Sequence, residues 1–180
     1  MAVNNYLLII TSNVNGLNAP IKRHRIAEWI SKHDPHISCL QETHLRTKDL
    51  HRLKVKGWKQ TFQANGHEKK SWGSNTHIRQ NRLQKKGHKK RPRKGQFILL
   101  KGRIHQEETN IVNIYAPNIG APKYIKKIME DFKKDIDSHT ITVGDFNTPL
   151  SKMDRSSKQN INKDIVSLNN TLEEMDLTDT

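Results

Sequence analysis

The stretch ITVGDFNTPL, residues Ile141 to Leu150, contains the strongest indication of the fold. An apolar, partly β-branched run stops at Gly144, and a carboxylate and an amide, Asp145 and Asn147, follow with one residue between them. A short apolar run that ends at turn residues indicates a buried strand. Side chains two positions apart on an extended chain point to the same side. The stretch therefore predicts a strand whose end presents Asp145 and Asn147 together.

This strand end has the groups that phosphodiester chemistry needs. A carboxylate such as Asp145 can orient or deprotonate an attacking water, and a neighbouring amide can donate a hydrogen bond to a charged phosphoryl oxygen. Gly144 would let the backbone turn and a substrate approach closely. Gly, Asp and Asn are also the usual residues of an ordinary turn. On this stretch alone, a turn without catalytic function stays open.

Strands and helices alternate along the rest of the chain, which indicates the α/β class. Short apolar runs predict the strands, and longer runs with one apolar face predict the helices. The strands are expected at residues 6–10, 36–40, 96–102, 110–118 and 140–147, and the helices at residues 21–33, 123–136 and 163–177.

Polar side chains also follow other predicted strands. Glu42 comes just after a strand, where α/β folds place ligands, and its carboxylate is the kind of ligand that Mg²⁺ accepts beside water and phosphate oxygens. Asn13 and Asn15 follow the first strand, and Tyr115 precedes the turn residues APN. Taken alone, each of these residues is also consistent with an ordinary surface or turn residue without a catalytic role. Together they supply an amide, a carboxylate and a phenol for one metal-assisted phosphodiester site.

Positive charge is concentrated in residues 67–94. This segment has 11 Lys and Arg against one Glu, so it holds +10 of the net charge of +14. Only three of its residues are aliphatic or aromatic, so we expect a disordered basic loop. Such a loop would bind nucleic acid through charge, with an affinity that falls as salt rises. The candidate contacts are Lys85, Lys86, Lys89, Lys90, Arg91 and Arg93.

A single cysteine, Cys39, excludes an intramolecular disulfide framework and a cysteine-based zinc cluster. It fits the nucleus or the cytosol, where thiols stay reduced. The apolar run at residues 6–10 is far shorter than the roughly 20 residues that span a membrane, and no basic leader precedes it. We expect an intracellular protein that is not secreted, has no membrane partner and needs no small-molecule cofactor.

Four segments, TSNVNGLN, CLQETHL, NIYAPN and GDFNTPL, carry a family resemblance. Together they closely resemble the endonuclease domain in the second reading frame of mammalian long interspersed (LINE-type) retrotransposons. That domain belongs to the exonuclease III, apurinic-endonuclease and DNase I-like superfamily. The resemblance covers most of the chain outside residues 67–94. It implies a four-layer α/β sandwich and Mg²⁺-dependent nicking of double-stranded DNA, with Mn²⁺ as an alternative ion.

The resemblance also implies a role for each candidate residue. Glu42 would hold Mg²⁺, and Asp145 would position or activate the water. Asn147 and Asn13 would hold phosphate oxygens or support the metal site. Tyr115 would contact the scissile phosphate.

The sequence departs from the family in two places. The family's domain continues past the position of Thr180 into further strands of the second sheet, with another Asp and a Ser-Asp-His signature that none of the ten histidines here matches. Residues 71–94 replace apolar strand residues of the family, and we hypothesise that they were read in a shifted frame. Residues 1–66 and 95–180 would then be two parts of one truncated domain, separated by the basic loop.

Three functions follow from these observations. The first is an endonuclease impaired by truncation. The second is a catalytically inactive retrotransposon remnant that binds nucleic acid non-specifically through its basic segment. The third, an inositol-phosphate phosphatase of the same superfamily, has no support beyond the shared motifs.

Overall fold

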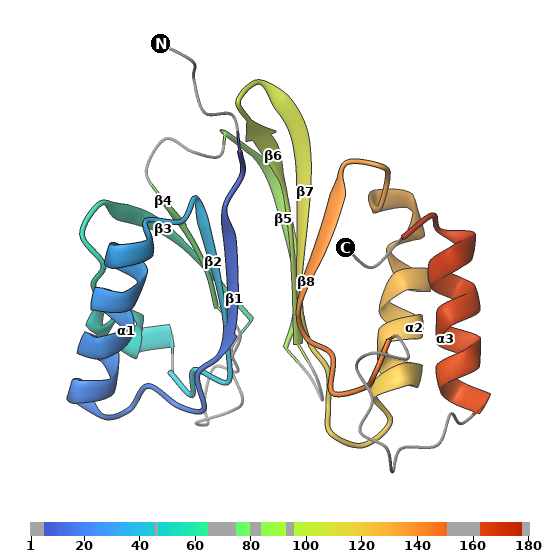
Figure 1. Cartoon of the computed structure of the whole chain (residues 1–180), viewed down its shortest axis with the longest axis horizontal. Helices are drawn as coiled ribbons and strands as arrows, with labels where there is room; N and C mark the ends of the chain where they lie inside the picture. The colour runs from blue at the N-terminus through green and yellow to red at the C-terminus, as the bar shows by residue number, and fades with distance from the viewer. Residues whose placement is uncertain are drawn as a thin grey trace.

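The computed structural model describes residues 6–45, 47–64, 75–79, 84–92, 96–150 and 163–177. These residues form two four-stranded sheets and three α-helices (Figure 1). The first sheet has the order β1-β2-β4-β3 and the second β5-β6-β7-β8. The strands of the first sheet are β1 (Ile9–Asn13), β2 (Ile37–Gln41), β3 (Trp58–Gln63) and β4 (Asn75–Arg79). The second sheet comprises β5 (Gln84–Pro92), β6 (Gln96–Ile104), β7 (Glu107–Tyr115) and β8 (Thr140–Asp145). The helices are α1 (Pro20–His33), α2 (Ala121–Asp131) and α3 (Lys163–Glu174), and two 3₁₀ turns are η1 (Thr47–Arg52) and η2 (Lys133–Asp135).

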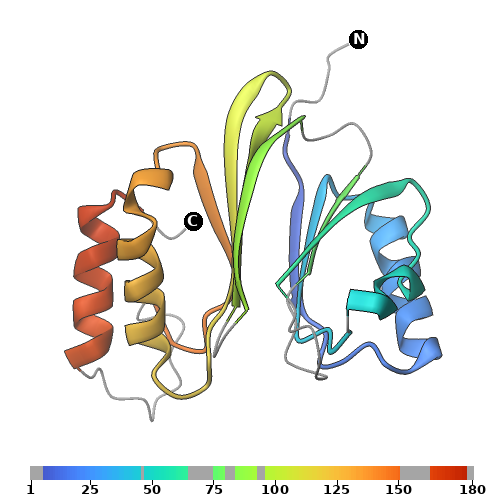
Figure 2. The same cartoon turned by 180° about the vertical axis from the view of Figure 1, so that it is seen from behind.

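The two sheets pack face to face, with helices on their outer sides (Figures 1 and 2). Strand β6 shows why, because its side chains alternate between two apolar layers. Phe97 and Leu99 pack towards α2 and α3, whereas Ile98 and Leu100 pack towards the first sheet. A third apolar layer lies between α1 and the first sheet and includes Ile30. The chain is therefore a four-layer α/β sandwich, and the predicted fold class is confirmed.

Parallel pairing brings four strand ends together. β1 pairs in parallel with β2, and β7 pairs in parallel with β8. The register places Asn13 opposite Gln41 in the first sheet and Tyr115 opposite Asp145 in the second. Since parallel strands end on the same edge of a sheet, polar residues after these strands share one end of the sandwich.

The structure corrects the expected loop at residues 67–94. β4 pairs with β2 and β3, and β5 pairs with β6 along its whole length. A disordered loop is wrong for these two stretches, because backbone hydrogen bonds to a neighbouring strand do not require an apolar side-chain pattern. Arg93 lies outside the described residues, as do the side chains of the other candidate contacts, namely Lys85, Lys86, Lys89, Lys90 and Arg91.

Two smaller corrections concern the N-terminal part. The first strand begins at Ile9 rather than at Tyr6, so Asn13 is its last residue rather than a residue after it. Helix α1 begins at Pro20, one residue before the expected start, and Ile30 is fully buried whereas Ile21 is 61% exposed. No helix in the described ranges is both long and apolar enough to cross a bilayer.

Candidate active site

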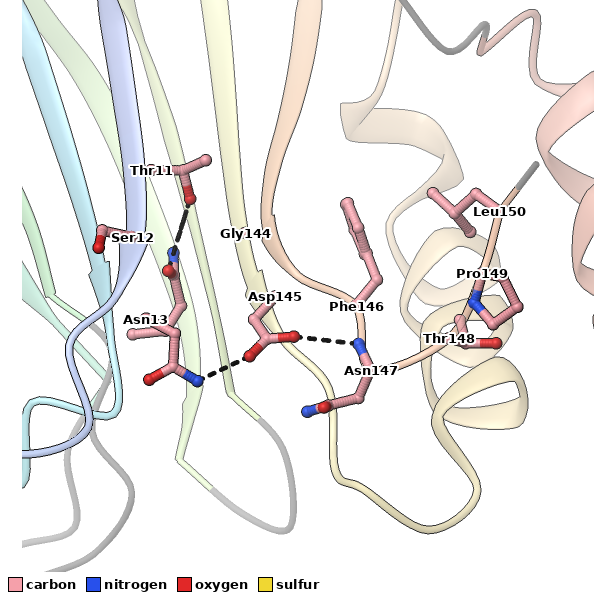
Figure 3. Close-up of a pocket in the computed structure, with 11 residues that line it drawn as sticks. Thr11, Ser12, Asn13, Gly144, Asp145, Phe146, Asn147, Thr148, Pro149 and Leu150 are labelled. Atoms are coloured by element: carbon pink, nitrogen blue, oxygen red, sulfur yellow. Dashed lines mark hydrogen bonds between the residues drawn. The ribbon is translucent and has the colours of Figure 1, made fainter. Parts of the chain in front are cut away.

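One amide joins the two sheets at the end of the sandwich. Asn13 Nδ2 donates hydrogen bonds to Glu42 Oε1 at 2.9 Å and to Asp145 Oδ2 at 2.7 Å. The hydroxyl of Tyr115 donates to the same Glu42 Oε1 at 3.0 Å. Figure 3 shows Asn13 and Asp145 pointing towards each other. Four of the predicted site residues therefore form one connected cluster, which we call the carboxylate cluster (Asn13, Glu42, Tyr115 and Asp145).

Backbone contacts hold Glu42 in place. Glu42 has a left-handed backbone (φ 51°), which turns the chain sharply after β2. Its carbonyl accepts a hydrogen bond from Gly16 N–H at 2.6 Å, so the loop after β1 is tied to the loop after β2. Asn15 contributes its own N–H, which donates to Asn13 Oδ1 at 3.0 Å. Asn15 is thus a turn residue that orients the Asn13 side chain.

Asp145 and Asn147 meet through a turn, not through strand alternation. Asn147 has a left-handed backbone (φ 47°), and its N–H donates to Asp145 Oδ1 at 3.2 Å. Its side-chain amide donates to the carbonyl of Ala116 at 2.8 Å. The expected convergence of the two side chains along an extended strand is therefore wrong, because β8 ends at Asp145. Asn147 stays beside the carboxylate cluster, and its amide supports the end of β7.

Gly144 permits the close approach of a neighbouring strand. Its φ is +138°, and a Cβ placed on it would lie 1.8 Å from the carbonyl oxygen of Ile114 on β7. The position that a Cβ would take is therefore filled by β7, while Gly144 also lines the open pocket. This packing keeps Tyr115 next to Asp145.

The residues of the carboxylate cluster differ in their exposure to solvent. Glu42 is 9% exposed and Tyr115 is 5% exposed, whereas Asn13 and Asp145 line an open pocket of about 660 Å³ together with Asn147 (Figure 3). Burial raises the pKa of the Tyr115 phenol well above its ordinary value, and the hydrogen bond to Glu42 and the charges of Glu42 and Asp145 raise it further. Tyr115 therefore remains a hydrogen-bond donor at neutral pH.

Comparison with known proteins identifies the family. Residues 10–178 match the profile of the Endonuclease/Exonuclease/phosphatase family. The chain belongs to this family. Members are nucleic-acid-processing enzymes and phosphatases, and they generally depend on a divalent metal.

Several solved structures share the fold at low sequence identity. TDP2 of D. rerio, in complex with a single-strand DNA product, superposes with a TM-score of 0.67 at 13% identity, over 90% of this chain and 64% of that one. The endonuclease domain of TRAS1, a telomere-specific non-LTR retrotransposon, gives 0.63 at 15% identity, over 94% and 71%. The mannosyl-6-phosphatase Bt3783 of Bacteroides thetaiotaomicron gives 0.61 at 19% identity, over 79% and 66%. The chain spans between 49% and 65% of the lengths of the TDP2 chains that it matches.

The donor set of this family member suits a hard divalent cation. Glu42 and Asp145 are close enough for one amide nitrogen to contact both, and Mg²⁺ commonly binds one or two carboxylates while keeping waters and phosphate oxygens. Within the described ranges, no group of three or more His, Cys, Asp or Glu residues could hold a metal ion. The cluster therefore fits an ion completed by water and substrate, and does not fit an ion fully enclosed by protein.

Sequence reasoning missed two buried amides below the cluster. Gln41 and Asn113 are 1% and 0% exposed, and they hydrogen-bond to each other across the two sheets. A signal was present, because Gln41 directly precedes Glu42, and Asn113 is a polar residue between apolar residues of a predicted strand, two positions before Tyr115.

The wild type is expected to lose stability at alkaline pH through Tyr115, and the Tyr115→Phe variant is expected to lack this contribution. The raised pKa of folded Tyr115 means that the unfolded chain gives up this proton first. Below the ordinary pKa of 10.0 the residue adds no pH dependence, and above it the free energy of unfolding falls as pH rises. Urea unfolding from about pH 8 to pH 11 measures this effect. The difference in unfolding free energy between wild type and Tyr115→Phe should shrink above pH 10.0, and a difference that stays constant would contradict the assignment.

Proposed function

We propose that the carboxylate cluster hydrolyses phosphodiester bonds in double-stranded DNA with Mg²⁺, as an endonuclease domain of retrotransposon origin. The observation that carries this proposal is the contact of one amide, Asn13, with carboxylates from both sheets. The fold shared with the TRAS1 endonuclease domain supports it, and so does the DNA product bound by the TDP2 relative. A chain with a net charge of +14 also suits a polyanionic substrate.

The proposed roles follow from burial and hydrogen bonding. Glu42 would hold the metal ion, Mg²⁺ or Mn²⁺, and the bound ion would stabilise negative charge on the phosphate. Asp145, which lines the open pocket, would orient and deprotonate the attacking water. Tyr115 and Asn13 already donate hydrogen bonds to the carboxylates of the cluster, and they would donate to phosphate oxygens of the bound DNA. Asn147 would join them only by releasing the Ala116 carbonyl.

A plasmid-nicking assay tests the proposed function. Supercoiled DNA incubated with the purified chain and Mg²⁺ should become nicked circles, and chelation of the ion with EDTA should stop the reaction. A sugar phosphate monoester, assayed in parallel for phosphate release, tests the phosphatase alternative. Nicking that is no faster than in a preparation of an Asp145 variant would refute the endonuclease, and release from the monoester alone would favour the phosphatase.

The second candidate function is non-specific nucleic-acid binding without catalysis. The observation in its favour is the charge of residues 67–94, which hold +10 of the net +14. We also propose that the protein acts in the nucleus or cytoplasm, because a single cysteine, Cys39, allows no intramolecular disulfide.

Neutralising the basic segment is expected to weaken DNA binding and flatten its salt dependence. β4 and β5 lie in this segment, so deleting it would remove a strand from each sheet. Substitution to Gln avoids that problem, at Lys85, Lys86, Lys89, Lys90, Arg91 and Arg93. The slope of log K against log salt should fall by about 0.9 for each phosphate that the variant no longer neutralises. Fluorescence anisotropy with labelled duplex DNA measures the slope, and an unchanged slope in the folded variant would contradict binding through this segment.

A further inference from the structure

A hydrogen-bonded bridge of two buried amides connects the sheets directly below the carboxylate cluster. Gln41 Nε2 on β2 donates to Asn113 Oδ1 on β7 at 2.7 Å. The same Nε2 lies 3.1 Å from Thr11 Oγ1 on β1, which reinforces the first sheet at this level. Gln41 and Asn113 are 1% and 0% exposed, and they are 72 positions apart in the chain. We call this pair the amide bridge.

Most of the other side chains that the structure describes in the layer between the sheets are apolar. They include Ile37, Ile98 and Ile111, with Val143 of β8 packed against them. Apolar contacts are not directional, so they hold two sheets together without fixing how far one sheet is shifted over the other. We call this relative shift the offset. A buried hydrogen bond is directional, and leaving either partner unpaired is unfavourable. The amide bridge is therefore the element of this layer best suited to fix the offset.

The offset between the sheets decides the geometry of the site. Gln41 directly precedes Glu42, and Asn113 lies two residues before Tyr115, which is paired with Asp145. Asn13 ends a strand of the first sheet and Glu42 directly follows another, whereas Tyr115 and Asp145 belong to the second sheet. Any slide of one sheet over the other would pull the two carboxylates apart. A misplacement of about 1 Å can lower a catalytic rate by about 10²-fold.

We propose that Gln41 and Asn113 are positioning residues, which lock the two sheets at the offset that brings Glu42 and Asp145 to one cation and one phosphate. Gln41 lines the open pocket, but both residues would act by placing the cluster and not by contacting the reacting atoms. The catalytic part of the proposal rests on the proposed function. The structural part, the locked offset, does not.

The experiment compares apolar replacement of both amides with a matched control. Gln41→Leu combined with Asn113→Leu removes both partners and keeps similar volumes, so the fold should survive. Asn110→Leu is the control, because Asn110 is a buried amide on the same strand that bonds to Asp137 near the other end of β8 and does not join the sheets. Spin labels at Lys32→Cys on α1 and Lys127→Cys on α2, in a Cys39→Ala background, report the distance between the two halves.

The double variant should show a broadened label distance and a kcat for nicking about 10²-fold lower, with a Kd for DNA within about twofold of wild type. The control should keep the narrow distance and the kcat of the wild type. A folded double variant with a narrow distance, or with a broad distance but full kcat, would overturn the proposal. If the wild type does not nick DNA, the proposed function fails, and the distance alone then decides the locked offset.

A length exchange keeps the test decisive if the double Leu variant does not fold. Gln41→Asn alone shortens the bridge by one methylene, and it should broaden the distance and lower kcat. Adding Asn113→Gln restores the total length, and it should recover both. A folded pair that stays as impaired as Gln41→Asn would refute the bridge.

Discussion

Asp145→Asn is expected to slow Mg²⁺-dependent plasmid nicking by about 10²- to 10⁴-fold, the range for loss of a general base. The substitution keeps the size of the side chain and an oxygen that can accept the N–H of Asn147. It removes the negative charge that the metal ion and the attacking water require. The single amide oxygen can accept from Asn147 or from Asn13 but not from both, so a small drop in the melting temperature should accompany the loss of kcat, with little change in the Kd for DNA. Rates from single-turnover nicking measure the effect.

Asp137→Asn is the matched control for this prediction. Asp137 lies just before β8, at the end of that strand opposite to Asp145, and it accepts hydrogen bonds from Asn110 and from the backbone of His139. The control removes the same charge far from the carboxylate cluster, so its nicking rate should match the wild type. Equal nicking by wild type and Asp145→Asn would contradict a role of this carboxylate in the reaction.

Gly144→Ala is expected to lower the free energy of unfolding by more than about 4 kcal/mol, the upper end for single substitutions. The added Cβ would lie 1.8 Å from the carbonyl oxygen of Ile114, and the φ of +138° is strained for any residue with a side chain. The neighbouring atom is backbone, so no side-chain rotation relieves the clash. β7 and β8 would have to separate where they present Tyr115 and Asp145. Urea unfolding followed by circular dichroism measures the loss.

Gly87→Ala provides the comparison for the glycine prediction. Gly87 lies on β5, and a Cβ added there meets no atom within 4 Å. Its unfolding free energy should stay close to that of the wild type. A Gly144→Ala chain that is as stable as the Gly87→Ala chain would show that the packing of β7 against β8 is looser than the structure indicates.

The sequence could predict that the candidate site residues lie close together because they sit at strand ends. Apolar runs locate strands, and the residue after a parallel strand lies at the same edge as its neighbours. The family resemblance then brought Asn13, Glu42, Tyr115 and Asp145 into one expected site, and the structure connects these four by hydrogen bonds. Their catalytic roles stay predictions until activity is measured.

The features that the sequence did not predict depend on contacts between distant segments. The strand at Gln84–Pro92 has no apolar pattern, and its pairing with β6 sets its conformation. The amide bridge joins residues 72 positions apart, so local pattern reasoning could not place them in contact. The turn at Asn147 replaced the expected extended chain because Asp145 accepts a backbone N–H two residues ahead.

Carboxylates from two sheets should form a single cation site, and anomalous diffraction from crystals soaked in Mn²⁺ tests this central claim most directly. Mn²⁺ scatters anomalously and, like Mg²⁺, prefers oxygen ligands. We predict one peak in contact with both Glu42 and Asp145, which disappears in crystals of Asp145→Asn. A well-bound Mn²⁺ elsewhere on the chain, with no peak in contact with these two carboxylates, would contradict the claim.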